Sequence, residues 1–64
     1  MKGVYIMFYF LTRTAKQKNA RRHIVSIYDT LEECINHPLL NTENTHQYYD
    51  LYNSKWELIK EGKR

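Results

Sequence analysis

The stretch VYIMFYFLTRTAKQKNARRHIVSIYD, residues 4–29, decides the predicted fold, because in it two apolar segments flank a basic one. Val4 to Thr12 is rich in β-branched and aromatic residues, as β-strands are. His23 to Asp29 has the composition of a second strand, so the basic segment between them predicts a hairpin with a long, mobile, positively charged tip. The first strand is predicted to be central, or covered by another chain, because apolar residues occupy both of its faces. These are Val4, Ile6, Phe8 and Phe10 on one face and Tyr5, Met7, Tyr9 and Leu11 on the other.

A short helix is predicted after the hairpin, in the segment DTLEECINHP, residues 29–38. Thr30 and Glu33 have the spacing of a capping box, in which each side chain satisfies a free backbone amide at the start of a helix. Pro38 should end this helix after about two turns, because proline is not tolerated in a helix interior. The polar segment Asn41 to Gln47 is predicted to be a loop.

The segment YYDLYNSKWELIKEG, residues 48–62, fits two structures. As a hairpin, it would turn at residues 53–55 and set Tyr52 opposite Trp56, a favourable cross-strand pair. As a helix, it would gather its aromatic and apolar residues on one face, and Gly62 would cap its C-terminus. The tyrosines and the turn-like NSK sequence favour the hairpin, and the helix stays as the alternative.

These elements predict a single small α+β domain over residues 1–64, with an antiparallel sheet and one short helix in the order ββαββ; the alternative is ββαα. A chain of this size buries only about 60% of its unfolded surface, so its stability margin is small. Homodimerisation would add buried area. It is expected because Val4 to Leu11 is apolar on both faces, and one short helix covers only one of them.

The sequence favours a cytoplasmic protein that does not enter a membrane. The apolar run from Val4 to Leu11 is far shorter than the roughly 20 residues that span a bilayer. It runs directly into basic residues rather than into the small residues of a signal-peptide cleavage site. Cys34 is the only cysteine, which is typical of a protein in a reducing compartment.

The cysteine and the histidines predict neither a catalytic site nor a metal site. Cys34 and His37 have a helical i, i+3 spacing, but Cys34 lies among apolar residues and is expected to act as a small buried hydrophobic group. Cys34, His37 and His46, together with His23, offer ligands that zinc favours, yet their spacing matches none of the usual zinc patterns. We therefore expect no metal and no cofactor.

The remaining polar residues also give no sign of catalysis. Asp50, Glu57 and Glu61 have the spacing of solvent-facing positions in strands, and the sequence gives none of them an obvious apolar pocket. The glycines are Gly3 and Gly62 alone, so a glycine-rich loop that cradles phosphate is absent. We expect a protein that is not an enzyme.

The basic segment TRTAKQKNARR, residues 12–22, is the strongest functional signal in the chain. It contains five cations and no acid, whereas all seven acids lie between Asp29 and Glu61. Cations that neutralise phosphates and release counterions supply much of the affinity of nucleic-acid binding. The segment predicts a contact with DNA or RNA, or with a protein that carries an acidic patch. The candidate residues are Arg13, Lys16, Lys18, Arg21 and Arg22. A simple solvated loop would have the same composition.

The aromatic content supports an alternative function. The chain has six tyrosines, two phenylalanines and one tryptophan, more than so small a domain can bury, and tyrosine and tryptophan are enriched at protein interfaces. Tyr48, Tyr52 and Trp56 are expected to form an exposed partner patch, or otherwise to belong to the core. The alternative function is a small inhibitor or adaptor, of the kind that viruses and mobile elements encode, acting on a larger enzyme or assembly.

Overall fold

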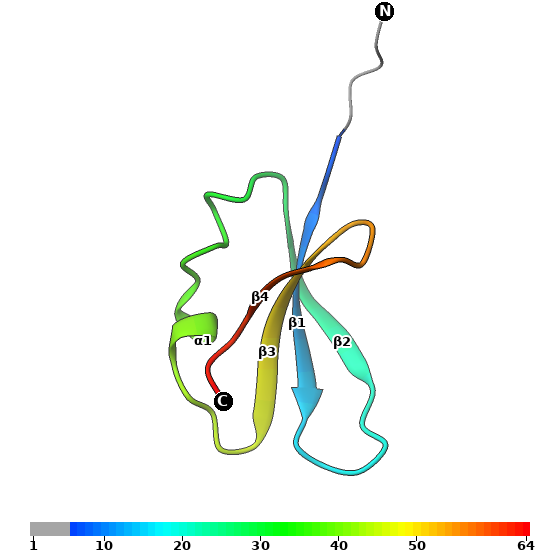
Figure 1. Ribbon diagram of the computed structural model, residues 1–64, viewed down its shortest axis with the longest axis vertical. Coiled ribbons are helices and arrows are strands. Elements are labelled where there is room, and N and C mark those ends of the chain that lie inside the picture. Colours follow the sequence, from blue (N-terminus) through cyan, green and yellow to red (C-terminus); the bar gives the residue numbers. More distant parts are fainter. Residues whose placement is uncertain (1–5) are drawn as a thin grey trace, which may run out of the picture.

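The computed structural model of the chain, which describes residues 6–64, is a small α+β domain with one open antiparallel sheet and one short helix (Figure 1). The sheet order is β2-β1-β3-β4. The predicted α+β class is confirmed. Along the chain the elements are β1 (Tyr9–Ala15), β2 (Arg22–Tyr28), α1 (Pro38–Asn41), β3 (Gln47–Asn53) and β4 (Leu58–Glu61).

β1 is a central strand, as its apolar faces predicted, because it pairs with β2 on one side and β3 on the other. Its predicted bounds are wrong in part. The strand begins at Tyr9, opposite Asn53, and continues into the basic segment as far as Ala15, opposite Gln47. The length of β3 therefore sets the length of β1, which local composition does not reveal. The predicted strand positions 4 and 5 lie outside the described residues.

The predicted helix over residues 30–37 is wrong. This segment forms turns, in which the amides of Cys34 and Ile35 both donate to the carbonyl oxygen of Leu31. Pro38 begins α1 instead of ending a helix, because its fixed φ and missing N–H suit the first helical position. The side chain of His37 caps α1, and its Nδ1 accepts a hydrogen bond from the amide of Leu39 at 3.1 Å.

The C-terminal segment is a hairpin, so the hairpin prediction is confirmed and the helical alternative is wrong. Its register differs from the predicted one, because the turn covers residues 54–57 and Tyr52 pairs with Leu58. Asn53 organises this turn: its Oδ1 accepts hydrogen bonds from the amides of Lys55 and Glu57, both at 2.9 Å. Trp56 takes the left-handed conformation in the turn, at φ 60°.

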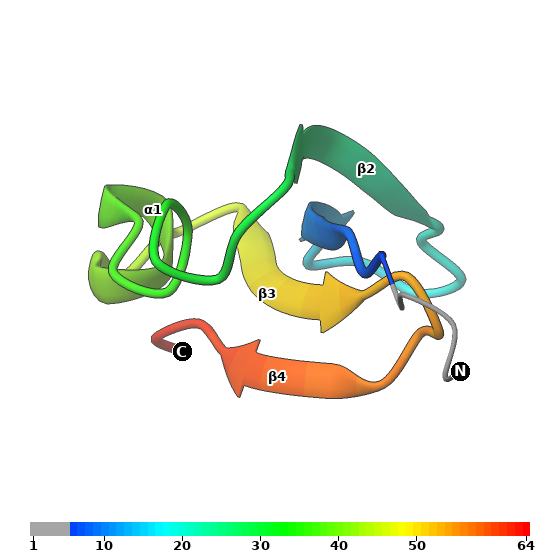
Figure 2. The same cartoon turned by 90° about the horizontal axis from the view of Figure 1, so that it is seen from above.

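The apolar core lies on one side of the sheet, where α1 and the segment before it pack (Figure 2). The chain end also docks on this side, since Lys63 donates its amide to the carbonyl oxygen of Leu40 at 3.0 Å and Lys60 Nζ donates to that of Ile35 at 3.1 Å. Within residues 6–64, no helix is long and apolar enough to cross a membrane. The fully buried apolar residues are Leu11, Cys34, Leu40 and Leu51.

Candidate functional site

The second side of the sheet, which we call the open face, faces away from the core. Side chains alternate along a strand, so Leu11 and Leu51 point into the core while their neighbours Phe10 and Tyr52 point away from it. Cross-strand pairing extends this face over all four strands. Its residues are Phe10, Thr12, Thr14, Arg22, Ile24, Ile27, Tyr48, Asp50, Tyr52, Leu58 and Glu61, with Trp56 packed beside Phe10 and Tyr52.

The five predicted cations are all exposed, but the fold divides them. Lys16, Lys18 and Arg21 lie in the loop between β1 and β2, which is six residues long because both strands extend into the basic segment. Arg22 is in β2, on the open face opposite Thr14. Arg13 is in β1 on the same side as Leu11, and it therefore points to the core side of the sheet. Four of the five cations are thus free to act together with the open face.

Two groups of residues that are separate in the sequence meet on the open face. The guanidinium carbon of Arg22 lies 4.7 Å from the centre of the Tyr52 ring. Lys16 Nζ lies 5.0 Å from the centre of the Tyr48 ring, and the guanidinium carbon of Arg64 lies 4.3 Å from it. The antiparallel pairing of β1 with β2 and β3 brings Lys16 and Arg22 of the basic segment against tyrosines of the predicted aromatic patch, and the chain end adds Arg64.

Trp56 is the most exposed member of the aromatic patch, with 51% of its surface accessible. Its ring lies 5.1 Å from that of Phe10 and 5.6 Å from that of Tyr52, measured between centroids, with tilted planes. Tyr48 and Tyr52 are half-buried. The structure therefore brings Tyr52 and Trp56 together as expected, while Tyr48 lies between the cations. Phe10 completes the ring cluster, and sequence reasoning missed it because it was assigned to a strand and not to a site.

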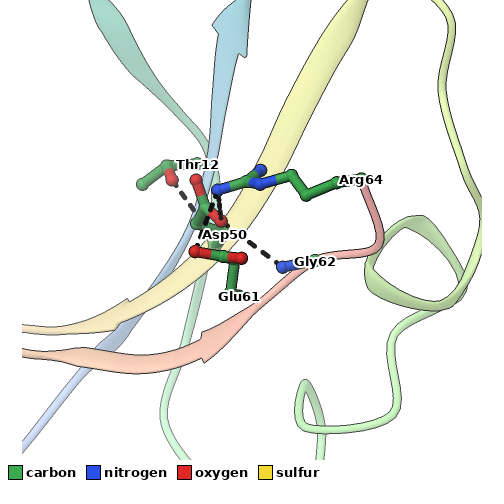
Figure 3. A network of polar contacts seen from close by, with 5 residues as sticks. All are labelled: Thr12, Asp50, Glu61, Gly62 and Arg64. Atoms are coloured by element: carbon green, nitrogen blue, oxygen red, sulfur yellow. Dashed lines mark hydrogen bonds and ion pairs between the residues drawn. The ribbon is translucent and has the colours of Figure 1, made fainter.

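Asp50 is buried on the open face, which contradicts the expectation that it faces solvent. Its Oδ1 accepts hydrogen bonds from Arg64 Nη2 at 3.0 Å and from the amide of Gly62 at 3.3 Å (Figure 3). Arg64 Nη2 also lies 3.3 Å from Glu61 Oε2, and the hydroxyl of Thr12 donates to the backbone carbonyl of Asp50 at 3.0 Å. The two acids that the strands place on the open face are both paired with one arginine. No local pattern in the sequence signals this network, because Asp50 and Arg64 lie 14 residues apart.

A polar cavity of about 290 Å³ is lined by Lys16 and Arg64, which both contact the Tyr48 ring, and by residues of the loop before β3. Lys16 of the hairpin and Arg64 both line this cavity, so positive charge extends from the hairpin to residue 64. One carboxylate also lines it, which makes the cavity less electropositive than the hairpin. The lining residues are Lys16, Glu43, Asn44, Thr45 and Arg64.

Cys34 is fully buried in the apolar core, as predicted. Burial raises the pKa of its thiol, and the negative charge of Glu33 raises it further. Its Sγ donates to the backbone carbonyls of Leu31, at 3.5 Å, and Thr30, at 3.6 Å, while His37 uses Nδ1 to cap α1. Within residues 6–64, no three histidine, cysteine or acidic residues come together in a way that would hold a metal ion.

Comparison with known protein families, curated proteins and solved structures finds no match to this chain.

Proposed function

We propose that this protein is a non-enzymatic, cytoplasmic domain that binds nucleic acid, DNA or RNA, with limited sequence specificity through the basic hairpin, residues 12–22. One observation carries the proposal: this hairpin presents five exposed cations and no acid. Such a surface gains affinity for phosphates by releasing counterions. Arg21 and Arg22 are the preferred phosphate ligands, because a guanidinium group makes paired hydrogen bonds to phosphate oxygens.

The pairing of two acidic residues next to the hairpin also favours an anionic ligand. On the open face, Asp50 and Glu61 are paired with Arg64. They therefore repel a polyanion less than free carboxylates would. The chain has a formal net charge of +3 with its histidines neutral, which also favours an anionic partner.

The test is binding of the protein to labelled random-sequence DNA and RNA over a range of salt concentrations. Replacing all five cations of the hairpin by alanine should abolish binding. Lys55→Ala and Lys63→Ala, made together, form the control, because both lysines are exposed and lie outside the hairpin; this variant should bind like the unmodified protein. Unchanged binding by the five-alanine variant would refute the proposal. The substituted residues are Arg13, Lys16, Lys18, Arg21 and Arg22.

A second candidate function is that of a small protein inhibitor or adaptor, of viral or mobile-element type, that binds an enzyme or assembly with an acidic patch. The observation that favours it is that β2 is an edge strand with exposed Ile24, Val25 and Ile27. An exposed edge strand pairs readily with another chain, and a second copy of this protein is one such partner. The test is a pull-down from nuclease-treated lysate. A stoichiometric protein partner that binds the unmodified chain but not the Ile27→Lys variant would favour this candidate. Light scattering of the same variant tests homodimerisation.

A further inference from the structure

We infer that the open face binds single-stranded nucleic acid, with a base stacked on the indole ring of Trp56 and phosphates further along the strand on the hairpin cations. This inference rests on the proposed function and adds to it the strandedness of the ligand and the residue that contacts the bases. Single-strand binders combine cations that follow the backbone with aromatic rings on which bases stack. In a duplex the base faces are already stacked on each other, so they are not available to an aromatic side chain.

Trp56 is both exposed and held in place. Half of its surface is accessible, yet it packs against the rings of Phe10 and Tyr52 at 5.1 and 5.6 Å. Its backbone is at φ 60° and its amide donates to the carbonyl oxygen of Asn53 at 2.9 Å. A positive φ is costly for a bulky residue and persists where surrounding contacts impose it. A ring fixed in this way loses little conformational entropy when a base stacks on it.

A series of contacts connects the hairpin to the Trp56 ring. Arg22 is one of the hairpin cations, and its guanidinium group lies over Tyr52 at 4.7 Å. Tyr52 in turn contacts Trp56. The loop of residues 16–21 and the turn of residues 54–57 lie at opposite ends of the sheet (Figure 1). A strand whose phosphates lie on Arg21 and Arg22 would therefore cross the open face along Tyr52 before its bases reach Trp56. The positive charge identifies the occupant as a polyanion rather than a neutral apolar peptide.

The experiment uses the intrinsic fluorescence of the unmodified protein, because Trp56 is its only tryptophan. The protein is titrated with oligothymidylate of about 12 nucleotides, within the usual range of single-strand site sizes, and separately with a duplex of the same length. Stacking should quench the fluorescence with the single strand and leave it nearly unchanged with the duplex. Binding is measured in parallel by the anisotropy of labelled oligonucleotides.

Variants of the open face separate stacking from general apolar contact. Trp56→Asn removes the ring while keeping a residue that tolerates a positive φ, and it should weaken single-strand binding at least about fivefold. Trp56→Phe should restore most of the loss. Leu58→Asn is the comparison variant, because Leu58 is equally exposed, at 51%, and pairs with Tyr52 on the same face. It removes an apolar side chain but no ring, so it should weaken binding clearly less than Trp56→Asn does.

Each remaining outcome counts against a defined part of the argument. Single-strand binding without quenching, or with equal affinity in Trp56→Asn, would overturn the inference and leave the proposed function intact. Equal losses in Trp56→Asn and Leu58→Asn would also overturn it, since the face would then act through apolar contact, as a protein partner requires. Absence of binding to both oligonucleotides at low salt would overturn the proposed function and the inference together.

Discussion

Single substitutions of Arg13 and Arg22 should have different effects on the salt dependence of binding, although both are exposed arginines of the basic hairpin. Arg22 lies on the open face over Tyr52, whereas Arg13 lies on the core side of the sheet. A single strand bound to the open face is in reach of the loop cations and Arg22, but not of Arg13. The sequence alone would treat the two arginines as equivalent.

The structure gives a magnitude for this difference. The cations within reach of a strand on the open face are Lys16, Lys18, Arg21 and Arg22. Each phosphate of a single strand that a cation neutralises contributes about −0.7 to the slope of log K against log salt concentration. Four contacts predict a slope of about −2.8, which is a loss of about 50-fold in affinity between 50 and 200 mM salt. Arg22→Ala should reduce the slope to about −2.1, or about 18-fold over the same range.

Arg13→Ala is the matched control for this measurement, because it removes the same charge from the same hairpin. Its slope should stay near about −2.8. The assay is the anisotropy of a labelled oligothymidylate, titrated at four or more salt concentrations. Equal reductions of the slope in Arg13→Ala and Arg22→Ala would refute the assignment of the open face as the binding surface.

Three further predictions concern stability and reactivity. Gly62→Ala should lower the free energy of unfolding by about 1–3 kcal/mol in urea denaturation, because a Cβ there would overlap the carbonyl oxygen of Tyr49. Asp50→Asn should lower the free energy of unfolding by about 1–2 kcal/mol, because it removes the charge that pairs with Arg64. This is less than the cost of breaking a fully buried ion pair, because Arg64 remains partly in water. Cys34 should react with iodoacetamide at pH 8 at least about tenfold more slowly in the native protein than in urea. Burial raises the pKa of the thiol and keeps the reagent away from it. Equal reaction rates in the two conditions would contradict this prediction.

The two hairpins were predictable from the sequence because the signals that specify them are local. Apolar runs on either side of the basic segment indicate β1 and β2, and the NSK sequence beside Trp56 indicates a turn. The exact strand bounds were not predictable, because they depend on the partner strand. β1 extends to Ala15 because β3 supplies a partner for it there.

The helix shows why a correct motif can predict the wrong element. The capping-box spacing of Thr30 and Glu33 is present, yet the backbone makes only turns around Leu31 and Cys34. Two turns of helix are marginal without a packed face, and here Cys34 alone is fully buried in this segment. Pro38 fits the end of one helix or the start of the next, and only the capping contact of His37 decides between them.

The candidate site was predicted by composition, but its arrangement was not. The cations of residues 12–22 and the aromatic residues after Tyr48 were identified separately. Their juxtaposition depends on the sheet order, in which β1 lies between β2 and β3. The same order creates the buried Asp50–Arg64 pair, which joins residues that share no local pattern.

Stability and binding are coupled in this chain because so little of the fold is buried. Four apolar side chains are fully buried in the described residues, while Ile27 and Trp56 on the open face remain 60% and 51% exposed. Exposed apolar surface of this kind is typical of interaction sites. A ligand that covers the open face binds the folded state and not the unfolded one, so it adds its binding free energy to the small stability of the domain. Hydrogen bonds and an ion pair around Asp50 join β3 to the chain end, and neither Ile27 nor Trp56 takes part in them, so these two side chains remain exposed on the open face.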